Sequence, residues 1–182
     1  MLFRSEVESA CTSILKKIDT VDVLVNNAGI MRDKTFLKMS EEEWDEVIKT
    51  NLYGPFYVTK NFLPKMIEHK SGRIINIASI AARGAFGKTN YAASKAGLIG
   101  MTKSLALEVG KYNITVNAVC PGYVDANMSS SIPDKYKKQF LSQIALGRMG
   151  TPQEIASVVS YLAGRESSYI TGAVIDINGG WL

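Results

Sequence analysis

The chain has 182 residues, of which 46% are hydrophobic and 21% charged, and its formal net charge at pH 7 is +4. This length and balance predict one soluble globular domain over residues 1–182. The lysines are scattered without an arginine and aromatic stripe, which argues against nucleic-acid binding. No apolar run is long enough to cross a bilayer, and no signal-peptide pattern follows Met1.

The number of cysteines and histidines indicates the cellular compartment and whether a metal site is expected. The two cysteines, Cys11 and Cys120, are too few for a disulfide framework, so we predict a reducing, cytoplasmic location. Cys120 follows an apolar run and is interpreted as a small packed hydrophobe. The single histidine, His69, and the absence of any cluster with ligand spacing predict no metal site.

The first half of the chain predicts a helix, a strand and a long helix. Residues 5–18 carry apolar side chains at helical spacing, and residues 21–25 form a short apolar run typical of a strand buried on both faces. Ser40 and Glu43 form a capping box that begins a helix reaching about residue 69. Gly54-Pro55 interrupts this helix and predicts a kink within it.

The second half alternates strands with helices. We expect Gly110 to end the helix at 90–109 as its C′ residue. Thr151, Pro152 and Glu154 predict the start of the last helix of the chain. The expected strands are 73–78, 114–120 and 172–177, and the expected helices are 90–109, a segment near 134–143 and one that begins at Thr151.

Four strands separated by helices predict an α/β fold with a parallel sheet, because crossovers of this length make parallel connections. Ligands bind such sheets at the carboxyl ends of the strands. Polar or turn-forming residues gather at these ends: Asn26, Asn27, Ser79, Pro121, Gly122 and Asn178.

The segment NYAASK, residues 90–95, carries the most chemistry. Tyr91 and Lys95 are four residues apart on a predicted helix and so share a face. An ammonium beside a phenol favours the phenolate, so we expect a lowered Tyr91 pKa and a tyrosine able to exchange protons near neutral pH. Ser79 is placed to hydrogen-bond the same oxygen. Taken alone, the spacing also fits an ordinary helix with a surface lysine and a half-buried tyrosine.

Several motifs occur together and in order: NNAG at 26–29, Asn51, Ser79, the Tyr91–Lys95 pair, ITVNAVCPGYV at 114–124 and ING at 177–179. Together they resemble the short-chain dehydrogenase/reductase family over nearly the whole chain. Within the family, NYAASKAGLIG followed by MTKSLALEV is most similar to the 3-oxoacyl-(acyl carrier protein) reductases of fatty acid biosynthesis and to acetoacetyl-CoA reductases. The resemblance implies a Rossmann-like, doubly wound fold.

The resemblance also implies catalytic roles. Tyr91 would protonate the substrate carbonyl oxygen as hydride arrives, Lys95 would tune Tyr91 and hold the nicotinamide ribose, and Ser79 would position the carbonyl. Asn51 would sit at the helix kink and hold a water that relays protons to Lys95. The reaction implied is NAD(P)H-dependent reduction of a 3-oxoacyl thioester or similar ketone.

Cofactor and partner contacts follow from the same resemblance. Asn27, Ala28 and Gly29 would line the adenosine side of NADP or NAD, and Pro121, Gly122 and Val124 would flank the nicotinamide. The helices at 40–69 and 90–109 would form the interface of a homo-oligomer.

The sequence departs from the family pattern in three places. Nothing before residue 21 resembles the glycine-rich turn that holds the pyrophosphate, so we expect an N-terminally truncated sheet that lacks about 60 residues, at about 30 residues per unit. That segment would decide between NAD and NADP. Ser79 and Tyr91 are 12 positions apart (91 − 79), one fewer than usual. Ala126 stands where the family often has threonine, and Asn127 is a possible substitute.

Three interpretations stay open. The chain is a carbonyl reductase; or a truncated, non-catalytic chain that assembles with full-length relatives; or a fragment of a longer product. The second and third rest on the truncation, which would leave residues 21–25 as an apolar sheet edge.

Overall fold

The computed structural model describes residues 2–125 and 141–181. Within them lies one four-stranded parallel sheet, in the order β1-β2-β3-β4. The fold is α/β and Rossmann-like, as the sequence predicts. The strands are β1 (Val23–Asn26), β2 (Gly72–Ile77), β3 (Ile114–Pro121) and β4 (Val174–Ile177).

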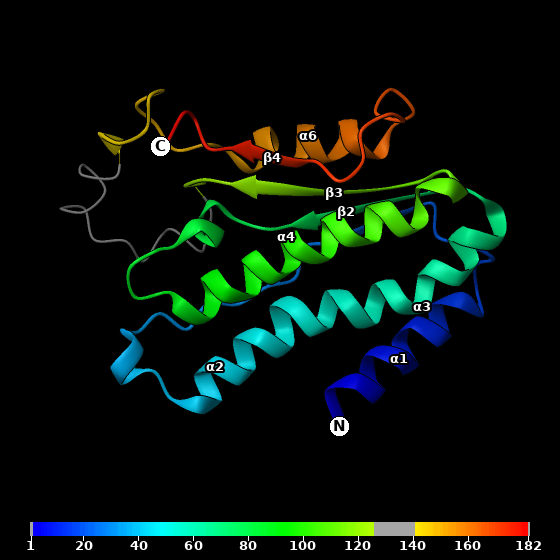
Figure 1. Ribbon diagram of the computed structural model, residues 1–182, viewed down its shortest axis with the longest axis horizontal. Helices are drawn as coiled ribbons and strands as arrows, with labels where there is room; N and C mark the ends of the chain where they lie inside the picture. Colours follow the sequence, from blue (N-terminus) through cyan, green and yellow to red (C-terminus); the bar gives the residue numbers. More distant parts are fainter. Residues whose placement is uncertain (1, 126–140, 182) are drawn as a thin grey trace.

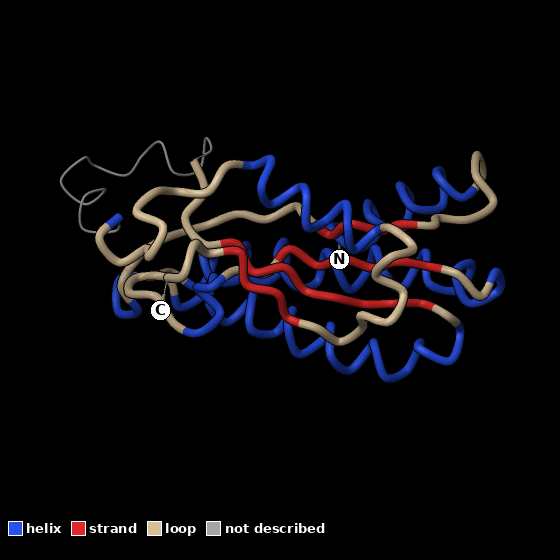
Figure 2. Tube along the Cα trace, turned by 90° about the horizontal axis from the view of Figure 1, so that it is seen from above, coloured by secondary structure: helices blue, strands red, loops and turns tan. Residues whose placement is uncertain are grey.

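Helices cover both faces of this sheet (Figure 1). One face carries the first four helices, and α6 lies on the other, which the view in Figure 2 shows as separate layers. The helices are α1 (Leu2–Leu15), α2 (Glu41–Ile48), α3 (Gly54–His69), α4 (Thr89–Val109) and α6 (Pro152–Ala163). Short helical turns connect them: η1 (Phe36–Lys38), η2 (Lys49–Tyr53), η3 (Ile80–Arg83) and η4 (Gly110–Tyr112).

The strand register brings the predicted polar residues to one edge of the sheet. Asn26 pairs with Asn76, Ile77 with Val119, and Pro121 with Ile177. All strands run in the same direction, so their carboxyl ends lie together at the left of Figure 1, where α2 and α4 begin. This arrangement decides where a site can form.

The core consists of two apolar layers, one on each face of the sheet. β3 is buried along nearly its whole length, because helices cover both of its sides. The layer under α1, α3 and α4 includes Cys11, Leu24, Phe62, Met66, Ile74, Ala106, Val109, Ile114 and Val116. The layer under α6 is built on Ile75, Val119 and Leu162. Cys120 is buried among apolar residues, as expected.

Strand β1 is exposed on one face, so the expectation of a strand buried on both faces is wrong. Leu24 and Asn26 are buried, whereas the Val23 and Val25 side chains are each 39% exposed. The reason is position: β1 lies at the sheet edge, and α6 packs on β2 and β3. The described residues therefore present an apolar edge strand.

The long second helix is interrupted, as predicted, and the interruption is a π-helical turn. Ser40 caps α2 with the complete capping box to Glu43. At η2 the Gly54 N–H bonds the Lys49 carbonyl five residues back. Pro55 has no N–H to continue the ordinary pattern, so the chain widens by one residue before α3 resumes. Asn51 lies inside this turn.

Several boundary predictions need correction, and β1 and β4 each begin two residues later than expected, at Val23 and Val174. The first helix covers Leu2–Leu15 rather than 5–18, and a turn at Lys16 and Lys17 ends it. Gly110 does not end α4 in a left-handed conformation; the chain continues into η4, and Asn113 takes the left-handed backbone with φ 59°. The capping box of α6 is confirmed. The helix expected near 134–143 falls largely outside the described residues.

In the part of the chain that the structure describes, no helix combines the length and the apolarity needed to span a membrane.

Candidate active site

A cavity of about 420 Å³ opens at the carboxyl edge of the sheet. The loops after β1, β2 and β3 form its walls, together with the first turns of α4. It brings together most of the predicted site residues. Those that line it are Asn27, Gly29, Ser79, Tyr91, Lys95, Pro121, Gly122 and Val124.

Ser79 is held at the mouth of this cavity by local geometry. It follows β2 directly and has an extended backbone. Its hydroxyl accepts a hydrogen bond from the Ala81 N–H at 3.1 Å and so caps η3. Gly84 then turns the chain with φ 115°, a conformation that favours glycine. The hydroxyl is therefore fixed at the end of a buried strand.

Tyr91 and Lys95 share one face of α4, as predicted. Lys95 is only 3% exposed, and its ammonium donates a 2.7 Å hydrogen bond to the carbonyl of Ile77 at the end of β2. The same Nζ lies 5.6 Å from the centroid of the Tyr91 ring. The lysine is thus tied to the sheet while its charge lies over the tyrosine ring.

The pKa values of the pair differ from expectation. Burial raises the pKa of Tyr91, the hydrogen-bonding interaction with Ser79 lowers it, and the charge of Asp33 raises it. The predicted lowering of the Tyr91 pKa by Lys95 is therefore wrong for this structure. Burial also lowers the pKa of Lys95 to about 8. Burial disfavours the charged form of each group and is the largest cause of both pKa shifts.

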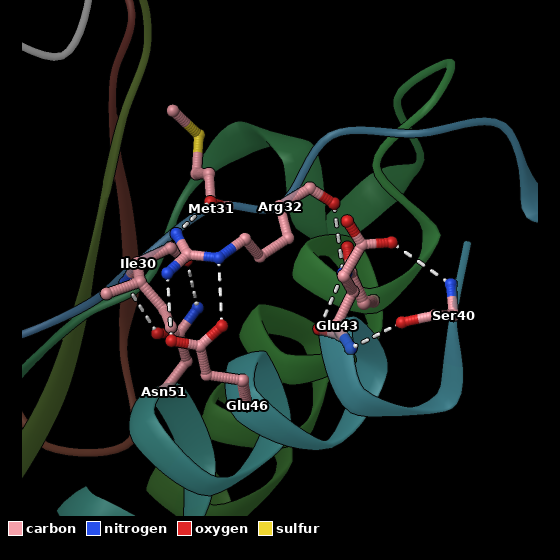
Figure 3. A network of polar contacts seen from close by, with 8 residues as sticks. Ile30, Met31, Arg32, Ser40, Glu43, Glu46 and Asn51 are labelled. Carbon is pink, nitrogen blue, oxygen red and sulfur yellow. Dashed lines mark hydrogen bonds and ion pairs between the residues drawn. The ribbon is translucent and has the colours of Figure 1, made fainter. Parts of the chain in front are cut away.

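Asn51 is fully buried in the π-helical turn η2. Its Oδ1 accepts from the Ile30 N–H at 2.8 Å, and its Nδ2 donates to the Ile30 carbonyl at 2.9 Å, as Figure 3 shows. Nδ2 also donates to the Ser94 hydroxyl on α4 at 3.2 Å. The side chain joins the loop after β1 to the helix that carries Tyr91.

The backbone at Gly29 closely approaches two of these groups. A Cβ added to Gly29 would lie 3.3 Å from Asn51 Oδ1 and 3.4 Å from Lys95 Nζ. The missing side chain therefore allows the loop after β1 to pack closely on Asn51 and Lys95. Asn27 and Gly29 line the cavity, and Ala28 between them does not. A small residue at this point suits a ligand that must reach Lys95.

Pro121, the last residue of β3, and Gly122 after it also line the cavity. A Cβ on Gly122 would lie 2.8 Å from Asn178 Cα, so this glycine allows the two loops to pack closely. Val124 bridges to Gly150. Ala126 and Asn127 lie outside the described residues. The glycine backbone in the cavity wall, the buried ammonium and the phenol fit the hydroxyl-rich ribose and flat ring of a nicotinamide nucleotide.

Sequence reasoning missed residues at the other end of the cavity. Met31, Asp33 and Lys88 line it there. Lys88 and Asp33 form an ion pair at 2.6 Å, and Lys88 Nζ lies 3.6 Å from Met31 Sδ. The loop at 30–39 has no periodicity or motif, so no local signal places it against the segment before Tyr91.

Comparison with known proteins agrees with this geometry. A family model described as Enoyl-(Acyl carrier protein) reductase matches residues 3–182. The chain is 48% identical to the 3-oxoacyl-(acyl-carrier-protein) reductase FabG of Aquifex aeolicus over 99% of this chain and 73% of that protein. It is 48% identical to the FabG of Thermotoga maritima, over 97% of this chain and 72% of that protein. It is 44% identical to the FabG of Vibrio cholerae, over 96% of this chain and 72% of that protein.

The fold and the site thus define an oxidoreductase of Rossmann-like architecture. The chain belongs to the short-chain dehydrogenase/reductase family, in which its relatives include the 3-oxoacyl-(acyl-carrier-protein) reductases.

Proposed function

We propose that this protein uses NADPH or NADH to reduce the ketone of a 3-oxoacyl thioester, a step of fatty acid synthesis, to the 3-hydroxy product. The observation that carries the proposal is one cavity at the sheet edge, where the half-buried side chains of Ser79 and Tyr91 lie together with the buried Lys95. The similarity to 3-oxoacyl-(acyl-carrier-protein) reductases supports the substrate class.

Tyr91 is the proton donor in this proposal. Its raised pKa keeps the phenol protonated at neutral pH, which is the state that carbonyl reduction requires. Ser79 hydrogen-bonds the carbonyl oxygen and orients it toward the phenol. As the carbonyl carbon gains a hydride, the oxygen takes the Tyr91 proton, and the substrate becomes a secondary alcohol.

Lys95 and the two cavity walls hold the cofactor in the proposal. When bound, the nicotinamide group supplies the hydride. The Lys95 ammonium, charged below its pKa of about 8, is available to the ribose hydroxyls. Asn27, Ala28 and Gly29 contact the adenosine side, and Pro121, Gly122 and Val124 flank the ring. Asn51 orders the loop at Ile30 and, with Lys95, supports proton return to Tyr91.

The experiment is a spectrophotometric assay of the purified protein with acetoacetyl-CoA and either NADPH or NADH. We expect turnover, and we expect Tyr91→Phe to reduce kcat by about 100- to 10,000-fold, the range for loss of a general acid. Tyr161→Phe, on the exposed part of α6, is the matched control and retains activity. Full activity of Tyr91→Phe, or no oxidation of either cofactor by the wild-type protein, would contradict the proposal.

The proposal includes association with a second copy through the helices at 40–69 and 90–109. It is supported by large hydrophobic side chains that are solvent-exposed on these helices, such as Phe56 and Leu107. Size-exclusion chromatography with light scattering tests it. Leu107→Lys should shift the protein toward the monomer, whereas Leu37→Lys, equally exposed on η1, should not. A cytoplasmic location is also part of the proposal and is supported by two free, buried cysteines.

A further inference from the structure

A second buried asparagine lies next to the proposed proton donor. Asn90 is fully buried in the first turn of α4. Its Oδ1 accepts from the N–H of Tyr91 at 2.7 Å. This N–H belongs to the first turn of a helix, where backbone donors lack helical partners. The side chain therefore satisfies the backbone of the residue that carries the phenol.

The amide nitrogen of Asn90 reaches two other elements. Nδ2 donates to the Arg32 carbonyl at 3.1 Å and to the Glu43 carbonyl at 3.2 Å. Each of its two N–H groups thus has one acceptor. One buried side chain joins the start of α4, the loop after β1 and the first turn of α2.

Both carbonyl acceptors belong to segments that are themselves anchored (Figure 3). The Arg32 guanidinium makes two 2.8 Å hydrogen bonds to the carboxylate of Glu46. Glu43 is held by the capping box with Ser40 and by a 2.7 Å ion pair with Lys34. The two carbonyls that Asn90 bonds therefore belong to backbone segments held in place by other contacts.

The same short loop is held by Asn51. Asn51 bonds both backbone groups of Ile30, and Asn90 bonds the carbonyl of Arg32 two residues later. Met31, between them, lines the cavity beside Tyr91. The loop segment 30–32 thus connects the π-helical turn with the start of α4, and both asparagines set its position.

We propose that Asn90 is a positioning residue for Tyr91: through the Arg32 and Glu43 carbonyls it fixes the first turn of α4, and with it the phenol, relative to Asn51 and Lys95. The proposal rests on the proposed role of Tyr91 as proton donor. A misplacement of about 1 Å at a reacting group can cost about 100-fold in rate, so a side chain that touches no substrate can still control catalysis.

The test replaces Asn90 by leucine, which has nearly the same shape and no polar atom. We expect kcat to fall by about 10- to 100-fold and the KM for the cofactor to change by less than about threefold. Asn61→Leu is the matched control, because Asn61 on α3 bonds only the Tyr57 carbonyl of its own helix in the described contacts, at 2.8 Å. It should retain activity. If the leucine variant does not fold, Asn90→Ser serves as the second variant, because the serine side chain is shorter and has a single hydroxyl donor in place of the amide.

Two further measurements separate positioning from a general loss of stability. Hydrogen exchange of peptides over 30–34 and 89–92 should become at least about tenfold faster in Asn90→Leu, while peptides of β2 and β3 keep wild-type rates. In the Tyr91→Phe background, Asn90→Leu should lower the residual kcat by less than about twofold, since residues that act as a unit are non-additive.

Each outcome decides the question. If Tyr91→Phe lowers kcat as expected, the role of Asn90 would be overturned by unchanged exchange at 30–34, by an unchanged kcat of Asn90→Leu, or by fully additive losses in the double variant. A Tyr91→Phe protein with wild-type activity would instead overturn the proposed function, and the role of Asn90 with it.

Discussion

The ammonium of Lys95 donates to the Ile77 carbonyl at 2.7 Å while lying 5.6 Å from the centroid of the Tyr91 ring. The lysine is therefore bound to the sheet while its charge lies over the tyrosine ring. Burial is the largest cause of both pKa shifts: the pKa of Lys95 is lowered to about 8 and that of Tyr91 is raised. At pH 7 the lysine is charged and the tyrosine is protonated.

The pH dependence of reduction should follow Lys95. Tyr91 stays protonated through neutral and mildly alkaline pH, because its pKa is raised. Lys95 loses its proton as the pH rises through about 8. We expect kcat/KM to be constant below this pH and to fall about tenfold per pH unit above it. A decline that begins only near the ordinary pKa of tyrosine, about 10, would assign the titration to Tyr91 instead.

The free energy of unfolding should also depend on pH because of the buried Lys95. Lys95 has a pKa of about 8 when folded against 10.5 in its ordinary state, so between these values the unfolded chain binds more protons. The free energy of unfolding therefore rises with pH across this window, by about 3 kcal/mol from this group.

Urea unfolding of wild-type protein and Lys95→Met at pH 7 to 10.5 measures this effect. The wild type should gain stability relative to the variant as the pH rises, because methionine has no proton to lose. A constant difference between the two proteins over this range would show that Lys95 titrates normally.

Gly29→Ala should weaken cofactor binding. The new Cβ would lie in tight contact with Asn51 Oδ1, at 3.3 Å, so that side chain must give way, and it would also touch Lys95 Nζ at 3.4 Å. We expect about a tenfold rise in the dissociation constant for NADPH or NADH, equal to about 1.4 kcal/mol, measured by fluorescence titration. Gly100→Ala on α4 is the control, since its Cβ meets nothing within 4 Å. Equal affinity of the two variants would argue against a cofactor contact at Gly29.

Gly97→Ala should destabilise the packing of α4 on η2. A Cβ at Gly97 would lie 2.9 Å from Cδ2 of Leu52, the residue after Asn51. Overpacking of this kind costs about 1–3 kcal/mol, whereas alanine for glycine in an open helix position gains up to about 1 kcal/mol. Thermal unfolding should therefore rank Gly97→Ala below wild type and Gly100→Ala above it. The reverse order would mean that Leu52 moves aside freely.

Much of the architecture was predictable because its signals are local. The capping boxes at Ser40 and Thr151 involve residues three apart, and both form as expected. The Gly54-Pro55 interruption follows from the missing proline N–H. Gly110 and Asn113 show the limit of such rules: both residues tolerate a left-handed backbone, and the 3-10 turn η4 decides that Asn113 adopts it.

The parallel α/β order and the placement of Ser79, Tyr91 and Lys95 at one sheet edge were readable from local signals, since strand and helix periodicity and four-residue spacing depend on neighbours along the chain. Only the tertiary structure decided the protonation preferences of that site and the asparagine contacts that hold it. Burial of Lys95 depends on β2, and the partners of Asn90 lie 58 and 47 residues away. Desolvation and long-range hydrogen bonds arise when distant segments pack, so no local pattern contains them.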